Sequence, residues 1–306
     1  MKFREISESD FEQALQRRRI RIWCATVAVI VGLLVVEIAI PEIRTLTRFS
    51  GETSAMVLLV VFCAALLCEF IDSTLGMGYG TTLTPLLLIS GFSPLQVVPC
   101  ILLSELVTGI AAGVMHHRDG NVDFFKDGQA RRTTFLLSIL SVAGAVAAVF
   151  IAVRIPTVWL NGIIAVIILS VGITILATIR RQFRYRKSHI ILVGGVAAFN
   201  KGLSGGGYGP LVTAGQVISG LSPKQAVAIT SLAESLACAV GLIAYLVLKQ
   251  GMIDFHLALP LLLGAVLSVP LATLAVRRLP EKMMRTSIGV TTCLLGLATL
   301  FKILAG

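Results

Sequence analysis

The stretch LGMGYGTTLTPLLLISGFSPLQ (75–96) is matched 129 residues later by SGGGYGPLVTAGQVISGLSPKQ (204–225). Both stretches place Gly-x-Gly-Tyr-Gly inside an apolar run, and both carry Ser-Pro-x-Gln at the same distance after it. Aligned without a gap, 70–114 and 199–243 share 15 of 45 residues. The shared residues include Gly, Pro, Gln and Glu, which an apolar composition alone would not repeat in register. The sequence therefore indicates an internal duplication.

The composition is that of a membrane protein. Of the 306 residues, 56% are hydrophobic and 14% are charged, whereas a soluble domain carries about 25% charged residues. Apolar runs of about 20 residues recur, which is the length a helix needs to cross about 30 Å of hydrocarbon. We therefore predict an all-α polytopic membrane protein that lies in the lipid bilayer and has no nucleic-acid partner.

The six cysteines indicate no special chemistry. All of them lie inside apolar runs and none forms a C-x-x-C motif, so they are interpreted as small core residues. The sequence predicts no metal site, no cofactor and no catalytic residue.

The placement of Lys and Arg predicts the topology, because cytoplasmic loops carry an excess of them. If each Gly-interrupted segment (about 58–90 and 190–219) enters and leaves by the same face, 20 basic residues lie on the N-terminal side and 5 on the other. If each segment crosses once, the split is 12 against 13. The first arrangement is favoured, with the N-terminus in the cytoplasm. Segments such as 190–200 are too short to span, although parity alone leaves full crossings open.

Each repeat is then a re-entrant broken-helix hairpin followed by three transmembrane helices. Because three is odd, the second repeat is inverted relative to the first. The predicted helices are 94–116, 133–153 and 158–179, and then 223–248, 257–276 and 283–305. The predicted parts are a basic cytoplasmic N-terminal segment (1–21), one extra transmembrane helix with an external loop (22–54), repeat 1 (55–179), a basic cytoplasmic connector (180–188) and repeat 2 (189–306).

Inverted repeats with broken helices are typical of secondary transporters, whose sites lie near the midplane where the breaks meet. Glycine lets each break expose backbone N–H groups, and the short helix after each break turns its dipole-positive end toward it, which suits an anion. The alternative is that the glycines only permit close helix packing. The candidate substrate-binding residues are Ser73, Thr74, Gly76, Gly78, Tyr79, Gly80, Thr81, Asn200, Lys201, Ser204, Gly205, Gly206, Gly207, Tyr208 and Gly209.

Charged residues at this depth are costly and therefore informative. Asp72 and Lys201 occupy equivalent positions in the two repeats and have opposite charges. They either form an ion pair with each other, or Lys201 binds the anion. Glu105 and Glu234 are also repeat equivalents. Each carboxylate has two possible roles. It either accepts hydrogen bonds from the N–H groups of a Gly loop and so holds that loop in place, or it carries a coupling proton. Gln96 and Gln225 are expected to stabilise the turns that precede their helices.

The paired Gly-rich segments, each followed by SGFSPLQ or SGLSPKQ and a helix bearing Glu, resemble the TauE/SafE family, also called the sulfite exporter or TSUP family. The resemblance covers most of 55–305 and excludes the basic N-terminal extension. It implies transport, usually outward across the bacterial inner membrane, of sulfite, sulfoacetate or a related sulfonate. From the residues alone the prediction is a small anionic substrate. The particular anion, the direction, a coupling proton or sodium ion, and a homodimer stay open.

Two other classes of protein fit the sequence less well. GLSG (202–205) has the form of a serine-protease motif, but such an enzyme needs a base near Ser204, and the histidines lie at helix ends or in loops. MGYG and GGYG resemble a potassium-channel filter, which needs four parallel loops about one axis. Two inverted loops do not supply them, so a non-enzymatic transporter is the favoured prediction.

Overall fold

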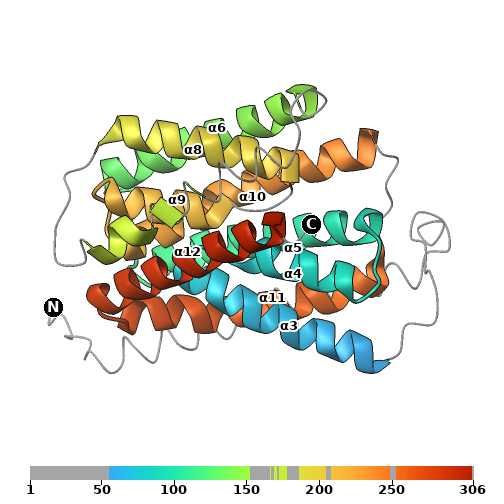
Figure 1. Cartoon of the computed structure of the whole chain (residues 1–306). Helices are drawn as coiled ribbons and strands as arrows, with labels where there is room; N and C mark the ends of the chain where they lie inside the picture. Colours follow the sequence, from blue (N-terminus) through green and yellow to red (C-terminus); the bar gives the residue numbers. More distant parts are fainter. Residues whose placement is uncertain are drawn as a thin grey trace, which may run out of the picture. The chain divides into compact units, whose positions relative to one another are not determined.

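A computed structural model describes residues 55–151, 166, 169–170, 172–177, 186–204, 208–248 and 253–304 (Figure 1). Within these ranges the secondary structure is helix, turn or loop without any strand, in agreement with the all-α prediction. The predicted segments 1–21 and 22–54 lie outside the described residues, and so does most of the predicted helix 158–179.

The helices follow one another with short connections. Four of those described, α3, α5, α10 and α11, are apolar and long enough to cross a membrane. The predicted spans after each hairpin correspond to α5, α6, α10, α11 and α12, with bounds within a few residues of those expected. The described helices are α3 (Ala55–Leu75), α4 (Tyr79–Ile89), α5 (Pro94–Arg118), α6 (Gly128–Ile151), α8 (Lys187–Ser204), α9 (Tyr208–Ile218), α10 (Pro223–Leu248), α11 (Phe255–Arg278) and α12 (Glu281–Leu304).

Two helix breaks interrupt the chain at equivalent places. The first separates α3 from α4 between Leu75 and Tyr79, and the second separates α8 from α9 between Ser204 and Tyr208. The expectation that the arm 190–200 is about as short as 209–219 is wrong. The second arms have 11 residues, but α8 has 18 and α3 has 21. Helix α8 extends past the expected end because the polar Lys201 in its last turn has buried partners, described below.

The Ser-Pro-x-Gln motifs start α5 and α10. The Ser93 N–H and hydroxyl donate to Gln96 Oε1 at 3.0 and 2.9 Å, and the Ser222 hydroxyl donates to Gln225 Oε1 at 3.1 Å. The proline of each motif occupies the first helical position, where its missing N–H costs nothing. These are the turn contacts predicted for the two glutamines.

The same glutamines connect the two halves of the chain. Gln96 Nε2 donates to Asp254 Oδ2 at 3.1 Å, and Gln225 Nε2 donates to Asp127 Oδ2 at 2.6 Å. Each aspartate also accepts a backbone N–H at the start of the following helix, α11 or α6. A turn in each half therefore anchors the start of a helix in the other half.

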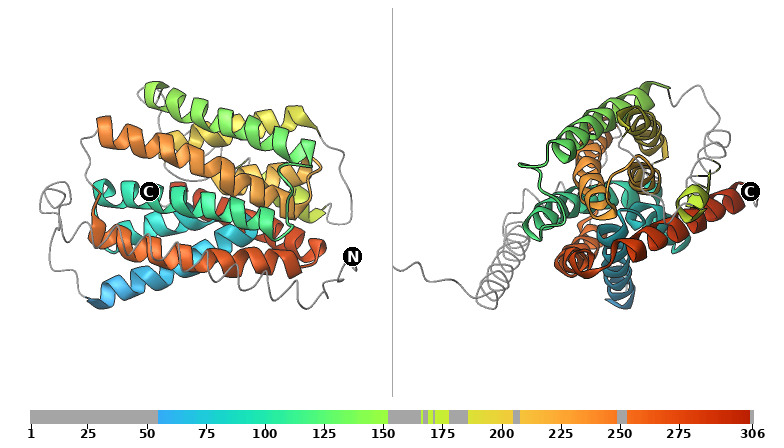
Figure 2. Two further views of the ribbon diagram at one scale, coloured as in Figure 1. Left: turned by 180° about the vertical axis from the view of Figure 1, so that it is seen from behind. Right: turned by 90° about the vertical axis from the view of Figure 1, so that its left-hand side faces the viewer.

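Helices α6 and α8 lie along one another, as do α11 and α3, with α5 and α10 between these pairs (Figures 1 and 2). Helices α5 and α10 run antiparallel, since Gly109 faces Ser231 and Ser235 whereas Leu102 faces Gly241. A Cβ atom on Gly109 would lie 2.6 Å from the Ser231 carbonyl oxygen. Glycine at this position therefore permits the close crossing of the two helices.

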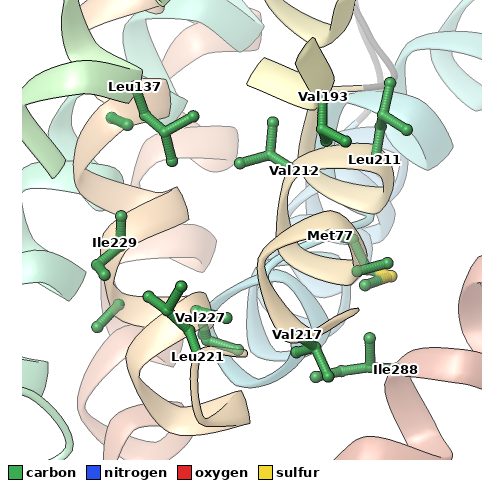
Figure 3. Close-up of a cluster of buried hydrophobic side chains, with 14 of the residues drawn as sticks. Met77, Leu137, Val193, Leu211, Val212, Val217, Leu221, Val227, Ile229 and Ile288 are labelled. Atoms are coloured by element: carbon green, nitrogen blue, oxygen red, sulfur yellow. The ribbon is translucent and has the colours of Figure 1, made fainter. Parts of the chain in front are cut away.

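Two buried apolar clusters surround the short helices. In lipid, such clusters are stabilised by close packing rather than by exclusion of water. The cluster around α4 draws on α3, α5 and α11. The cluster around α9 also receives Met77 from the first break, so the two halves share one packed interior. Figure 3 shows members of the cluster around α9, with labels on Met77, Leu137, Val193, Leu211, Val212, Val217, Leu221, Val227, Ile229 and Ile288.

Candidate functional site at the two helix breaks

The first helix break contacts the start of α9, the helix that follows the second break. A Cβ atom on Gly209 would lie 2.5 Å from the Gly76 carbonyl oxygen and 2.8 Å from Met77 Cα, so the first break passes directly over the first turn of α9. Thr213 Oγ1 donates to the same Gly76 carbonyl at 2.8 Å. Gly76 has φ +72°, a conformation that favours glycine. The structure thus brings the Gly76–Gly80 break against the start of α9.

Lys201, on the last turn of α8, lies between carboxylates from α5 and α10. Its Nζ donates to Glu105 Oε2 at 2.9 Å and to Glu234 Oε1 at 2.5 Å, and all three side chains are buried. The alternative that Lys201 pairs with Asp72 is wrong. Among the described carboxylates, those within 4 Å of Nζ are the two glutamates. The antiparallel crossing of α5 and α10 brings these equivalent glutamates together, and the lysine reaches between them.

Glu105 gathers donors from three helices. Its Oε1 accepts the Gly80 N–H at the start of α4 at 3.1 Å, and its Oε2 accepts Lys201 Nζ and the Cys238 thiol, the latter at 3.1 Å. A Cβ atom on Gly80 would lie 2.6 Å from Oε1, so glycine is required for this contact. Glu105 thereby makes the backbone contact that a scaffold role needs. Its equivalent Glu234 accepts from Lys201 alone among the described residues.

Two more carboxyl groups on α3 border the first break. Asp72 Oδ1 accepts the Tyr79 N–H at 3.4 Å. Glu69 lies one turn earlier, is buried, and accepts the hydroxyls of Ser73 and Thr108 at 2.6 and 3.2 Å. Within the described part of the chain, neither carboxyl group forms an ion pair with a basic side chain. The dipole-positive start of α4 is therefore already faced by the chain's own carboxyl groups.

The two tyrosines of the Gly-x-Gly-Tyr-Gly motifs are fully buried, and their hydroxyls bond to serines on neighbouring helices. The Tyr79 hydroxyl lies 2.7 Å from Ser104 Oγ on α5, and the Tyr208 hydroxyl lies 2.6 Å from Ser141 Oγ on α6. Buried hydroxyls need such partners. The rings therefore anchor each break to a different neighbouring helix, and the two half-sites are unequal.

A small cavity of ≈ 10 Å³ lies between the breaks. That volume is about what a single water molecule requires, so this conformation is closed to a larger anion. Thr81 Oγ1 is buried beside the cavity and has no hydrogen-bond partner among the described residues. The lining residues are Asp72, Gly78, Tyr79, Gly80, Thr81, Glu105, Tyr208, Gly209, Pro210 and Glu234.

The candidate residues predicted from sequence are thus placed unequally. Ser73 bonds to Glu69 rather than lining the cavity, and the Thr74 hydroxyl is buried without a partner among the described residues. Asn200 and Ser204 belong to α8, but their side chains lie outside the described residues, as do the whole residues Gly205, Gly206 and Gly207.

Three residues near the breaks were missed by sequence reasoning. Glu69 lies four residues before Ser73 on one helix, a spacing that predicts a shared face, but it has no equivalent in the second repeat. Cys238 was interpreted as a core residue, although it follows Glu234 by four positions. His116 lies near the end of α5, where its side chain is fully buried with Nε2 3.1 Å from the Ser73 carbonyl oxygen. No sequence signal distinguishes it from the neighbouring His117.

Membrane-length apolar helices and two broken helices that meet around buried charges define the class as a polytopic membrane transporter. The chain belongs to the sulfite exporter TauE/SafE family, whose family model matches residues 61–299. It is therefore a membrane transporter and not an enzyme, as the sequence predicted.

Comparison with curated proteins gives the same class. The chain is 31% identical over 258 residues to the probable membrane transporter protein YtnM of Bacillus subtilis (strain 168). That alignment covers 79% of this chain and 82% of the relative. No solved structure matches the chain significantly.

Proposed function

We propose that the protein is a secondary transporter that moves a small sulfur-containing anion, such as sulfite, sulfoacetate or a related sulfonate, outward across the bacterial inner membrane. Transport proceeds by alternating access around a midplane site built from the two Gly-rich helix breaks. The substrate class comes from the family. The location of the site at these breaks is inferred from the hydrogen-bond donors that lie beside them, described below.

The proposed architecture is a pair of inverted repeats with the N-terminus in the cytoplasm. Helices related by a twofold axis in the membrane plane run antiparallel, and the equivalent helices α5 and α10 do so. The two breaks begin and end at positions 129 residues apart, like the sequence repeat. The split of 20 basic residues against 5 favours the same topology. In this proposal α3–α4 is a hairpin open to the outside, and α8–α9 one open to the cytoplasm.

One observation supports anion binding most directly. The backbone N–H of Gly80 and the ammonium of Lys201 converge on the two oxygens of a single oxyanion, the Glu105 carboxylate. A helix N-terminus and a buried cation are the donors that a sulfonate or sulfite oxygen requires. The Thr81 hydroxyl, without a partner among the described residues, is available as a further donor.

The small volume between the breaks supports alternating access rather than an open pore. At ≈ 10 Å³, the cavity has no room for a sulfonate group, so an anion enters only when one hairpin moves relative to its neighbours. Close packing of the second hairpin favours rigid-body motion, because α9 is buried along nearly its whole length. The first hairpin is less enclosed, with Leu86 on α4 43% exposed.

The proposal is tested by ligand stabilisation followed by flux. A bound ligand stabilises the folded state by RT ln(1 + [L]/Kd), which is about 2.7 kcal/mol at 100 times Kd. We expect sulfite, sulfoacetate or isethionate to raise the melting temperature of the detergent-solubilised protein, whereas sulfate and chloride do not. The stabilising anion should then leave preloaded proteoliposomes only when the protein is present.

Two variants sharpen this test. Lys201→Met should remove the stabilisation by the anion, because the cation of the site is lost. Glu281→Gln, at an exposed carboxylate in the first turn of α12, is the matched control and should respond like the unmodified protein. Equal responses to all five anions, or none to any, would refute the substrate class.

A further inference from the structure

The Glu105 carboxylate accepts hydrogen bonds from the same donors that the proposed function assigns to the substrate. It is held by a helix N-terminal N–H at 3.1 Å, by an ammonium at 2.9 Å and by the Cys238 thiol at 3.1 Å. These contacts come from α4, α8 and α10, which are the elements that form the two breaks and their support. In the closed conformation an internal oxyanion therefore fills the place of an external one.

The charges around Glu105 are unbalanced. Carboxyl groups come from α3 (Glu69, Asp72), α5 (Glu105 itself) and α10 (Glu234), and they interact electrostatically with one another. Among the described residues Lys201 is the one cation in this group. The remaining titratable neighbours are Cys68 on α3, Tyr79 on α4, Tyr208 on α9 and Cys238 on α10.

Four ionised carboxylates and one ammonium would carry a net charge of about −3, and that charge would repel an anion. Unpaired charges at this depth are also costly. An anion can therefore displace Glu105 from Lys201 and Gly80 only if the carboxylate that it displaces loses its charge. A proton from solvent is the simplest way to remove that charge, because protonation converts the carboxylate into a neutral acid that no longer competes for the ammonium.

We propose that Glu105 is the proton-coupling residue of the transporter, ionised and bound to Lys201 and Gly80 when the site is empty, and protonated when the substrate anion takes its place. This inference rests on the proposed function. One hydronium ion gives its proton to a Glu105 oxygen, the ion pair with Lys201 breaks, and a substrate oxygen accepts from the freed donors. Anion and proton are then bound together and move in the same direction.

The coupling has a consequence for the direction of transport. A dianion that travels with one proton carries one net negative charge. A membrane potential that is negative inside drives that charge outward. Glu105 and its equivalent Glu234 are not interchangeable in this role, because Gly80 N–H and Cys238 donate only to Glu105 among the described contacts.

The test is binding of sulfoacetate to the purified full chain, measured between pH 6 and pH 8.5 in weakly buffered detergent solution. We expect the unmodified protein to take up one proton per bound anion, so that its affinity falls about tenfold for each unit that the pH is raised. Glu105→Gln should bind with an affinity that does not change with pH, more tightly than the unmodified protein at pH 8.5, and without proton uptake. A residue with only a structural role would give weaker binding and an unchanged pH profile.

Two comparison variants separate the outcomes. Glu234→Gln should keep the pH dependence, and so should the exposed control Glu281→Gln. If the unmodified protein binds sulfoacetate with no change across the pH range, the inference is wrong and the proposed function stands. If neither sulfoacetate nor sulfite binds even at pH 6, the proposed function fails, and the coupling role fails with it. Proton uptake that persists in Glu105→Gln would also overturn the assignment.

Discussion

Replacing Lys201 with methionine would remove an ammonium while keeping most of the side-chain volume. Glu105 and Glu234 would lose their shared partner, to which they now lie at 2.9 and 2.5 Å. The three side chains are only 5–11% exposed, so water cannot take over the lysine's role without a rearrangement of the helices. Two buried carboxylates would then have to remain charged without a cation or accept protons.

The expected loss of stability follows from this burial. Removing one partner of a buried ion pair costs roughly 3–5 kcal/mol, which is a factor of about 150 to 5,000 in the folding equilibrium. Replacing all three residues by neutral groups of similar shape, as in Lys201→Met with Glu105→Gln and Glu234→Gln, should be nearly neutral. Asp72→Asn should not restore the loss in Lys201→Met as the two glutamine substitutions do, because Asp72 forms no ion pair with the lysine.

The assay is reversible denaturant unfolding of the four proteins in one detergent at pH 7. A large loss for the single variant, recovery in the triple variant and no comparable recovery in Lys201→Met with Asp72→Asn would support the arrangement. A single variant as stable as the unmodified protein would refute the ion triad. So would a triple variant that is as unstable as the single one.

Further predictions follow from the same contacts. In Gly76→Ala the new Cβ atom would clash with the Thr213 hydroxyl, and the residue would have to keep a left-handed backbone. We therefore expect a loss of about 1–3 kcal/mol in the free energy of unfolding. A neutral result would show that the first break does not contact α9. Thr81→Val should weaken binding of the stabilising anion about 2-fold to 12-fold, the value of one hydrogen bond, as measured by titration calorimetry. In the proposed topology, a cysteine at Gly91 should react with a membrane-impermeant maleimide from outside, and one at Glu281 only from the cytoplasm; the reverse pattern would refute the orientation.

Much of the fold could be predicted because the residues that end or start helices are chemically distinctive. Glycine and proline mark the breaks and the helix starts, and a capping glutamine acts within four residues of its serine, as at Ser93 and Gln96. Such local signals do not depend on the rest of the chain. They located the second arms and the following helices to within a few residues.

The partners of the buried charges could not be predicted in the same way. Lys201 pairs with Glu105 and Glu234 rather than with Asp72. This choice of partners depends on how closely α5 and α10 cross at Gly109. The sequence shows that position 109 is glycine, but it does not show which residues of α10 this glycine faces. Glu69 could not be predicted from the repeat, because this carboxylate has no equivalent in the second half of the chain. Long-range pairing is set by packing, which a single sequence records only indirectly.

The exchanged bonds from Gln96 to Asp254 and from Gln225 to Asp127 have the form of an isologous contact, in which each partner gives what it also receives. Two identical copies of one half, related by a twofold axis, would make the same pair of bonds across that axis. Joining the copies into one chain makes the association independent of concentration. It also frees the two copies to differ. Only then can a single lysine stand between two equivalent glutamates, because a strictly symmetric pair would have to supply two lysines or none.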